Sequence, residues 1–202
     1  MPSEKLLSYQ EIGDSDHESL WHAFKSGDRN AFSKIYNEHV DFLYNYGRQI
    51  VNDGSFIEDV IQDLFIYLWN SRDRLSDVHS IRYYLLKAFR RDLLKTIKKQ
   101  RNKQSNLFSI DIESFGMVEC VQDELISSQE EREKIEIIRK AVNQFTGRQK
   151  EILYLKFYQA LSYEEIARVL DLDLKYVYNT ASKAYKNLRE HLTPAARNFS
   201  FK

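Results

Sequence analysis

Basic side chains crowd one segment of this 202-residue chain, and the chemistry that they offer is the binding of phosphate groups. From Arg82 to Lys103 the lysines and arginines are opposed only by Asp92, which falls on the apolar side and is expected to pair with a group of a neighbouring helix. A solvated helix face normally mixes charges of both signs, so an almost purely basic stripe favours nucleic acid over water. With a helical period, the stripe consists of Lys87, Arg91, Lys95 and Lys98.

The segment from residue 55 to about residue 70 combines an apolar face with an unusual exposed one. Its apolar face, which should be buried, carries Ile57, Val60, Ile61, Leu64 and Leu68. Its opposite side carries Asp59, Gln62, Asp63, Ile66 and Trp69. Apolar side chains rimmed by carboxylates are typical of a protein-binding surface, and burial of Trp69 at a domain edge is an equally good interpretation of the pattern.

Near the end of the chain, a helix at about 163–170, the turn 171–173 and a helix at about 174–192 form a helix-turn-helix pattern. The buried face of its second helix is predicted to carry Leu174, Val177, Ala181, Ala184, Tyr185, Leu188 and Leu192. Its outward face carries Lys175, Tyr176, Asn179, Ser182, Lys183 and Lys186. These side chains can contact base edges and phosphates, although a merely solvated face has the same composition.

The sequence offers no recognisable catalytic or metal-binding constellation. Its histidines, His17, His22, His39, His79 and His191, are scattered, and no glycine-rich phosphate loop is present. Cys120 is the only cysteine, which excludes an internal disulfide and a zinc site of several cysteines. We therefore expect a protein that is not an enzyme and that needs neither cofactor nor metal.

The elements that position these residues are predicted to be helices throughout. Only six glycines and two prolines occur in the chain, and its length favours two small domains over one large core. The fold class is therefore all-α, with two small helical domains joined by a flexible acidic linker. The N-terminal domain is predicted at 15–102, the linker at 103–130 and the helix-turn-helix domain at 131–193.

Local signals mark the expected ends of the helices. Two helices should occupy about 15–51, interrupted at Gly27-Asp28, and a capping box of Ser55 with Glu58 should open the next one. A polar loop, 71–80, precedes the basic helix at about 81–99. In the second domain we expect helices at about 131–145, 147–158, 163–170 and 174–192. Their predicted caps are Thr146 with Gln149, Ser162 with Glu165, and Asp173.

The location of the protein follows from what the chain lacks. Its first residues are polar and acidic, and no apolar run approaches the roughly 20 residues that span a bilayer. We expect a cytoplasmic protein without membrane insertion.

Three groups of residues resemble those of a known family, the extracytoplasmic-function (ECF) sigma factors of bacterial RNA polymerase. The first is Gly27-Asp28 with Ala31-Phe32 and Tyr36. The second is the run from Asp59 to Phe65 followed by Leu68-Trp69, and the third is the run from Leu161 to Ala167. Their order and spacing cover about 20–102 and 131–192.

The resemblance implies a role for each group of residues. Core RNA polymerase would be bound by Asp59, Gln62, Asp63, Ile66 and Trp69. The opened minus-ten element of promoter DNA would be bound by Arg74, His79, Lys87, Arg90, Arg91, Lys95 and Lys98. The minus-thirty-five element would be bound by Ser162, Lys175, Tyr176, Asn179, Ser182, Lys183 and Lys186. An anti-sigma factor is a further partner that the resemblance allows.

The sequence departs from the family at three places. The basic helix has Arg90-Arg91 where an Arg-Asn pair is common, and Asp171 replaces the turn glycine, whose left-handed conformation an aspartate can adopt. The second helix of the helix-turn-helix lacks several arginines that are usual in the family. The promoter sequences that family members bind therefore cannot be assigned to this chain.

Two rival functions remain open at this point. A free-standing helix-turn-helix regulator that binds an operator as a homodimer would explain the C-terminal domain, but not the Trp69 surface. A helical adaptor without a nucleic-acid function would explain that surface, but not the basic stripe. Co-purification with core polymerase would separate the sigma-factor reading from both.

Overall fold

The computed structural model describes residues 14–103, 115–116 and 140–191, and the chain divides into an N-terminal unit, 1–108, and a C-terminal unit, 109–202. All regular elements within these described ranges are helical. The predicted linker and most of the helix expected at 131–145 lie outside them, although 140–143 are helical. Phe115, which falls in the predicted linker range, is buried with its ring 5.6 Å from the ring of Tyr154.

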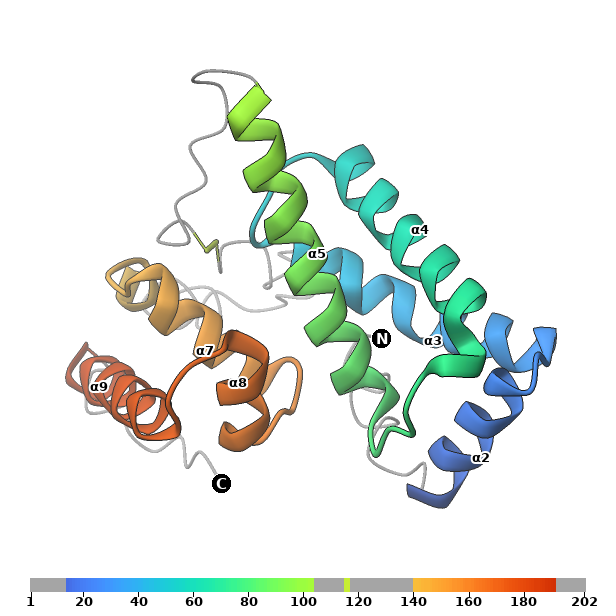
Figure 1. Cartoon of the computed structure of the whole chain (residues 1–202). Coiled ribbons are helices and arrows are strands. Elements are labelled where there is room, and N and C mark those ends of the chain that lie inside the picture. Colours follow the sequence, from blue (N-terminus) through green and yellow to red (C-terminus); the bar gives the residue numbers. More distant parts are fainter. Residues whose placement is uncertain (1–13, 104–114, 117–139, 192–202) are drawn as a thin grey trace, which may run out of the picture. The chain divides into compact units, whose positions relative to one another are not determined.

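Four α-helices and one 3-10 turn make up the described part of the N-terminal unit (Figure 1). They are α2 (Asp14–Lys25), α3 (Arg29–Arg48), α4 (Gly54–Ser71), the turn η1 (Arg72–Arg74) and α5 (Ile81–Lys103). Helices α3, α4 and α5 pack against one another, and α2 packs on α3. The basic segment is thus a helix that leans on two others, which leaves part of its circumference uncovered.

The core of this unit lies where α3, α4 and α5 meet. The face of α4 predicted to be buried is buried at all of its positions, Ile57, Val60, Ile61, Leu64 and Leu68. At Gly47 an added Cβ would come within 2.8 Å of Ile57 and 3.2 Å of Phe89, so α3 approaches both neighbouring helices more closely than a side chain allows. The large apolar side chains bury a substantial area here. Each Å² of apolar surface removed from water stabilises the fold by roughly 25 cal/mol.

Two helix starts in this unit are set by aspartates. Asp28 accepts hydrogen bonds from the backbone N–H groups of Asn30 and Ala31, after Gly27 has turned the chain at a φ of +91°. Asp53 accepts one from the N–H of Phe56, so α4 begins at Gly54. The predicted N-cap at Ser55 is therefore wrong, because the Asp53 carboxylate occupies that role and the Ser55 hydroxyl donates to it instead, over 2.9 Å.

The C-terminal unit contains α7 (Gly147–Phe157), α8 (Tyr163–Leu170) and α9 (Leu174–His191) in its described part. Each helix contacts the other two, around a core that includes Phe145, Leu153 and Ala184. The predicted capping boxes of Thr146 with Gln149 and of Ser162 with Glu165 are both confirmed. Short helices of this kind depend on such caps and on the packing of one face, because they are marginal on their own.

The helices of the described residues include none that is both long and apolar enough to cross a membrane.

Candidate protein-binding and nucleic-acid interfaces

The outer face of α4 carries acidic and apolar side chains together, as predicted. Asp59, Gln62 and Asp63 are exposed, and Ile66 keeps 58% of its surface accessible. Tyr67, which the sequence analysis missed, is 55% exposed beside Ile66. We call Asp59, Gln62, Asp63, Ile66 and Tyr67 the α4 surface. Tyr67 could have been found from the helical period, because it lies one turn after Asp63.

Trp69 is only partly exposed, which favours the domain-edge interpretation over a fully exposed aromatic. Its ring lies 5.0 Å from the ring of Phe32, and the Arg72 guanidinium lies 4.6 Å from its centre. The same guanidinium donates a hydrogen bond to the Trp69 carbonyl oxygen over 2.7 Å. Trp69 therefore joins α3, α4 and η1, and its substitution would disturb packing as well as any surface contact.

The basic stripe of α5 is exposed at the positions predicted for it. Lys87, Lys95 and Lys98 lie on the surface, where their charges can meet phosphates. Arg91 is also exposed, but its guanidinium donates to the Asp92 carboxylate over 3.1 Å, and this hydrogen bond raises the pKa of Arg91. The partner of Asp92 is thus its neighbour in the chain, Arg91. The sequence analysis had instead expected a group of a neighbouring helix.

Arg90 does not belong to this exposed stripe. Only 8% of its surface is accessible, so its burial gives no support to the predicted contact with DNA, which stays a prediction. Leu86, Leu93 and Ile97 are all buried, which extends the apolar face of α5 toward Arg90. This apolar face is wide because α5 packs against both α3 and α4.

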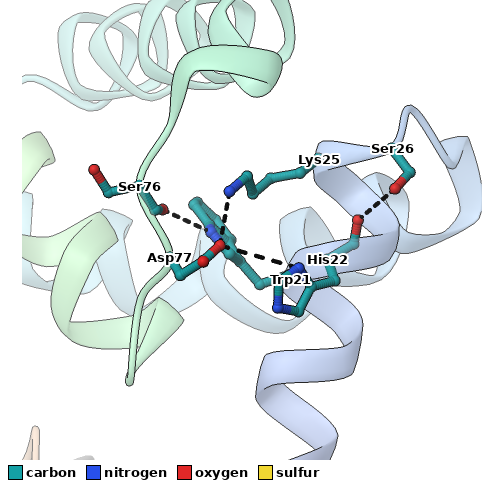
Figure 2. Close-up of polar contacts among 6 residues, drawn as sticks. All are labelled: Trp21, His22, Lys25, Ser26, Ser76 and Asp77. Carbon is teal, nitrogen blue, oxygen red and sulfur yellow. Dashed lines mark hydrogen bonds and ion pairs between the residues drawn. The ribbon is translucent and has the colours of Figure 1, made fainter.

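The loop between η1 and α5 is attached to α2 (Figure 2). The Trp21 indole N–H donates to the Ser76 carbonyl oxygen over 3.0 Å, and Lys25 donates to the Asp77 carboxylate over 2.7 Å. Arg74 and His79, predicted to bind DNA, are both exposed on this segment, with Arg74 3.9 Å from Asp73. The Ser80 hydroxyl accepts from the N–H of Tyr83 and so starts α5.

The geometry of α8 and α9 is that of a helix-turn-helix. Asp171 ends α8 in the left-handed conformation, with φ 54° and ψ 52°, as expected for the residue at the position of the turn glycine. Asp173 then accepts a hydrogen bond from the N–H of Tyr176 at the start of α9, as predicted. The turn therefore needs no glycine, because aspartate tolerates this conformation better than most residues.

The predicted outward face of α9 is exposed along its length. It consists of Lys175, Tyr176, Asn179, Ser182, Lys183 and Lys186. Ser162, assigned to the same interface, is partly buried, and its hydroxyl accepts the capping hydrogen bond from Glu165. Leu174 was predicted to be buried and is 36% exposed, at the first position of α9.

Tyr178 links the two helices of the motif and was not assigned a role from the sequence. Its hydroxyl donates to the Glu164 carboxylate over 3.1 Å, and its ring lies 4.6 Å from that of Tyr163. This hydrogen bond raises the pKa of Tyr178 and, after a backbone hydrogen bond, contributes to lowering that of Glu164. The contact fixes the crossing of α8 and α9 at their exposed edge.

Comparisons with known protein families agree with this geometry. Residues 35–103 match Sigma-70 region 2, and residues 135–188 match Sigma-70, region 4. The ECF RNA polymerase sigma factor SigX of Bacillus subtilis (strain 168) is 26% identical over 164 residues, which cover 80% of this chain and 83% of SigX. SigK of Mycobacterium ulcerans (strain Agy99), also an ECF RNA polymerase sigma factor, is 21% identical over 183 residues, 88% of this chain and 94% of SigK.

Two solved structures share the fold. CnrH, in complex with the cytosolic domain of CnrY, aligns with a TM-score of 0.55 at 17% identity over 86% of this chain and 95% of CnrH. The sigma factor RpoE of Bartonella quintana, in complex with the anti-sigma factor NepR, aligns with a TM-score of 0.55 at 16% identity over 79% of this chain and 95% of that chain.

A region 2 domain followed by a region 4 domain defines a sigma factor of the sigma-70 class. With relatives of one subgroup matched over most of their length, the chain belongs to the ECF-type RNA polymerase sigma factors. It is an alternative sigma factor, whose class directs promoter recognition and transcription initiation.

Proposed function

We propose that the two units divide the work of initiation between three surfaces. The α4 surface binds core RNA polymerase, while the exposed lysines of α5 and the loop before it bind the opened minus-ten element. The outward face of α9 binds the minus-thirty-five element. The chain acts in the cytoplasm as a non-catalytic subunit of the polymerase and needs no cofactor.

The observation that carries this proposal is the placement of two chemically opposite faces on neighbouring helices. Ile66 and Tyr67 are exposed among carboxylates on α4, whereas α5, which packs beside it, exposes Lys87, Lys95 and Lys98. An apolar centre with an acidic rim suits a basic protein surface, and a lysine stripe suits a phosphate backbone. One compact unit can thus contact polymerase and promoter DNA at the same time.

An anti-sigma factor is the further partner that we propose. The RpoE structure with a similar fold contains the anti-sigma factor NepR. For this chain, such a partner would act by covering the α4 surface or the α5 lysines and so competing with polymerase or DNA.

Reconstitution tests the proposal against its rivals. The chain is mixed with core RNA polymerase, the complex is isolated by gel filtration, and initiation is measured on genomic promoter fragments of the source organism. We expect a stable complex that starts transcription at sites where core enzyme alone does not. Specific DNA binding by the chain without polymerase would favour the free-standing regulator, and polymerase binding without promoter-specific initiation would favour the adaptor.

A further inference from the structure

Three side chains of helix α2 lie close to one point of the chain, the middle of the loop between η1 and α5. Trp21 donates to the Ser76 carbonyl over 3.0 Å, Lys25 donates to Asp77 over 2.7 Å, and His22 Nδ1 lies 4.0 Å from the same carboxylate oxygen (Figure 2). The partners are separated by 52 to 55 positions in the sequence. α2 also ends before residue 35, where the match to region 2 begins.

Trp21 connects this loop to the unit's core. Its side chain is 1% exposed, and its ring lies 5.1 Å from Phe24 of α2 and 5.4 Å from Tyr84 of α5. The ring therefore has a position fixed by packing, and its only N–H donor is directed at the Ser76 carbonyl. A donor carried on a rigid, buried side chain orders a loop at little cost in side-chain entropy.

Lys25 adds a charge effect to this attachment. Its side chain is 22% exposed, and its hydrogen bond holds the pKa of the Asp77 carboxyl below its usual range. Without Lys25, the Asp77 carboxylate would present its negative charge on the same segment as Arg74 and His79, the exposed groups that we propose to meet DNA. Pairing with Lys25 directs this charge toward α2 and reduces its repulsion of phosphates.

From these contacts we infer that α2 is a positioning element for the loop between η1 and α5, acting through Trp21 and Lys25. The loop's two ends are set by η1 and by the Ser80 cap of α5, and the contacts from α2 fix the residues between them. In this state Arg74 and His79 are presented in one arrangement to the opened minus-ten strand, so less ordering has to occur when DNA binds. The inference rests on the proposed minus-ten role of the loop and α5.

The test uses reconstituted holoenzyme and a labelled single-stranded oligonucleotide with the minus-ten sequence of a mapped promoter. Trp21→Phe keeps a buried aromatic ring but removes the N–H donor together with the five-membered ring of the indole, while Lys25→Met keeps the stem and removes the charge. Lys25→Glu combined with Asp77→Lys restores the pair in reversed order. Lys34→Met on α3, another surface lysine paired with an acid, is the matched control.

We expect Trp21→Phe and Lys25→Met each to weaken oligonucleotide binding by about two- to tenfold, the range of one hydrogen bond. Affinity for core polymerase should not change, and Lys34→Met should behave as wild type. Lys25→Glu alone should be worse than Lys25→Met, and the reversed pair should recover part of the loss. Hydrogen exchange should be faster at the amides of residues 75–79 in both single variants, a readout that general destabilisation of α4 or α5 does not produce.

Unchanged oligonucleotide binding in both Trp21→Phe and Lys25→Met would overturn the inference. Loss without recovery in the reversed pair, or with equal loss in Lys34→Met, would also contradict it. Replacing Lys87, Lys95 and Lys98 by Gln distinguishes a failure of this inference from a failure of the proposed minus-ten interface. If that change weakens DNA binding but the α2 variants do not, only the inference fails; if neither does, the proposed minus-ten interface fails with it.

Discussion

The buried imidazole of His39 is kept neutral by its surroundings in the folded protein. It is 3% exposed in α3, with its ring 5.6 Å from that of Phe42. Burial, followed by the charges of Arg82 on α5 and His17 on α2, lowers the pKa of His39 from its usual 6.5 to about 4. The folded protein therefore excludes a proton that the unfolded chain binds below pH 6.5.

A pH-dependent stability follows from this difference. His39 contributes no penalty above pH 6.5, and stability is lost as pH falls from 6.5 toward 4, because the unfolded state alone takes up the proton. Between pH 7 and pH 5 the wild-type N-terminal unit should lose about 2 kcal/mol more than His39→Leu, at about 1.4 kcal/mol per pKa unit. Urea unfolding followed by tryptophan fluorescence measures this unit alone, since both tryptophans, Trp21 and Trp69, lie in it. Parallel losses in the two proteins would show that His39 is protonated in the folded state.

The two sides of helix α5 differ in role, because one packs in the core and the other is the side that we propose binds DNA. Phe89, Leu93 and Ile97 are buried on one side, and Lys87, Lys95 and Lys98 are exposed on the other. Charges on the exposed side contribute little to stability and are available to phosphates.

Replacing Lys87, Lys95 and Lys98 together by Gln should therefore affect DNA without unfolding the protein. The dependence of open-complex formation on salt should flatten by about two to three units of log–log slope, slightly under one unit per phosphate contact. Lys34→Gln on α3 serves as the control of equal charge change per site. A triple variant with the wild-type slope would remove α5 from the DNA interface.

Helix α9 should determine promoter sequence through two residues of its exposed face. Asn179 and Lys183 are one turn apart and both exposed, and a lost bidentate base contact costs about 1–3 kcal/mol of discrimination. In transcription from a library randomised across the minus-thirty-five element, Asn179→Ala and Lys183→Ala should each relax preference at one or two positions. Lys175→Ala, which removes a proposed phosphate contact on the same helix, should lower transcription from all sequences alike. An intact preference in both variants would mean that bases are contacted elsewhere.

The elements differ in how far the sequence predicts them. Periodicity and capping residues locate α4, α5, α7, α8 and α9, since local hydrogen bonds and one buried face define each of them. The error at Ser55 arises because Asp53, two positions earlier, competes for the same N–H groups. The DNA contact of Arg90 was implied by the family resemblance and not by the helical period, which does not tell how many helices surround α5.

The sequence predicts the candidate site where the exposure of a side chain follows from the helical period. It does not predict the site where exposure depends on contacts with residues far away in the sequence. The outward faces of α4 and α9 follow from their sequences, with Tyr67 overlooked rather than hidden. The contact of Trp21 with Ser76 spans 55 positions and has no local signal, so only the folded structure reveals it. Trp69 lies between these cases, because its exposure depends on Phe32 and Arg72 from other elements.

For the whole molecule, charge balance favours a factor that binds promoter DNA as a subunit of the polymerase. The chain has 30 basic and 30 acidic residues, so it lacks the net positive field with which many proteins bind DNA unaided. The exposed lysines of α5 are offset elsewhere, and weak binding by the lone chain limits contact with non-promoter DNA. In the function that we propose, polymerase supplies the remaining affinity, and the proposed contact of the α4 surface is then the one on which the other two depend.

The most direct measurement is the affinity of the full chain for core RNA polymerase when the α4 surface is changed. Ile66→Ala with Asp63→Lys alters only exposed side chains, so the variant should remain helical and should unfold at the wild-type urea concentration. Its free energy of binding to core should weaken by about 2 kcal/mol or more, roughly 30-fold in Kd, as for truncation of an interface hot spot. Glu18→Lys, an acid-to-lysine change on the exposed side of α2, should bind as wild type. A folded double variant that binds core polymerase with wild-type affinity would contradict the account at its centre.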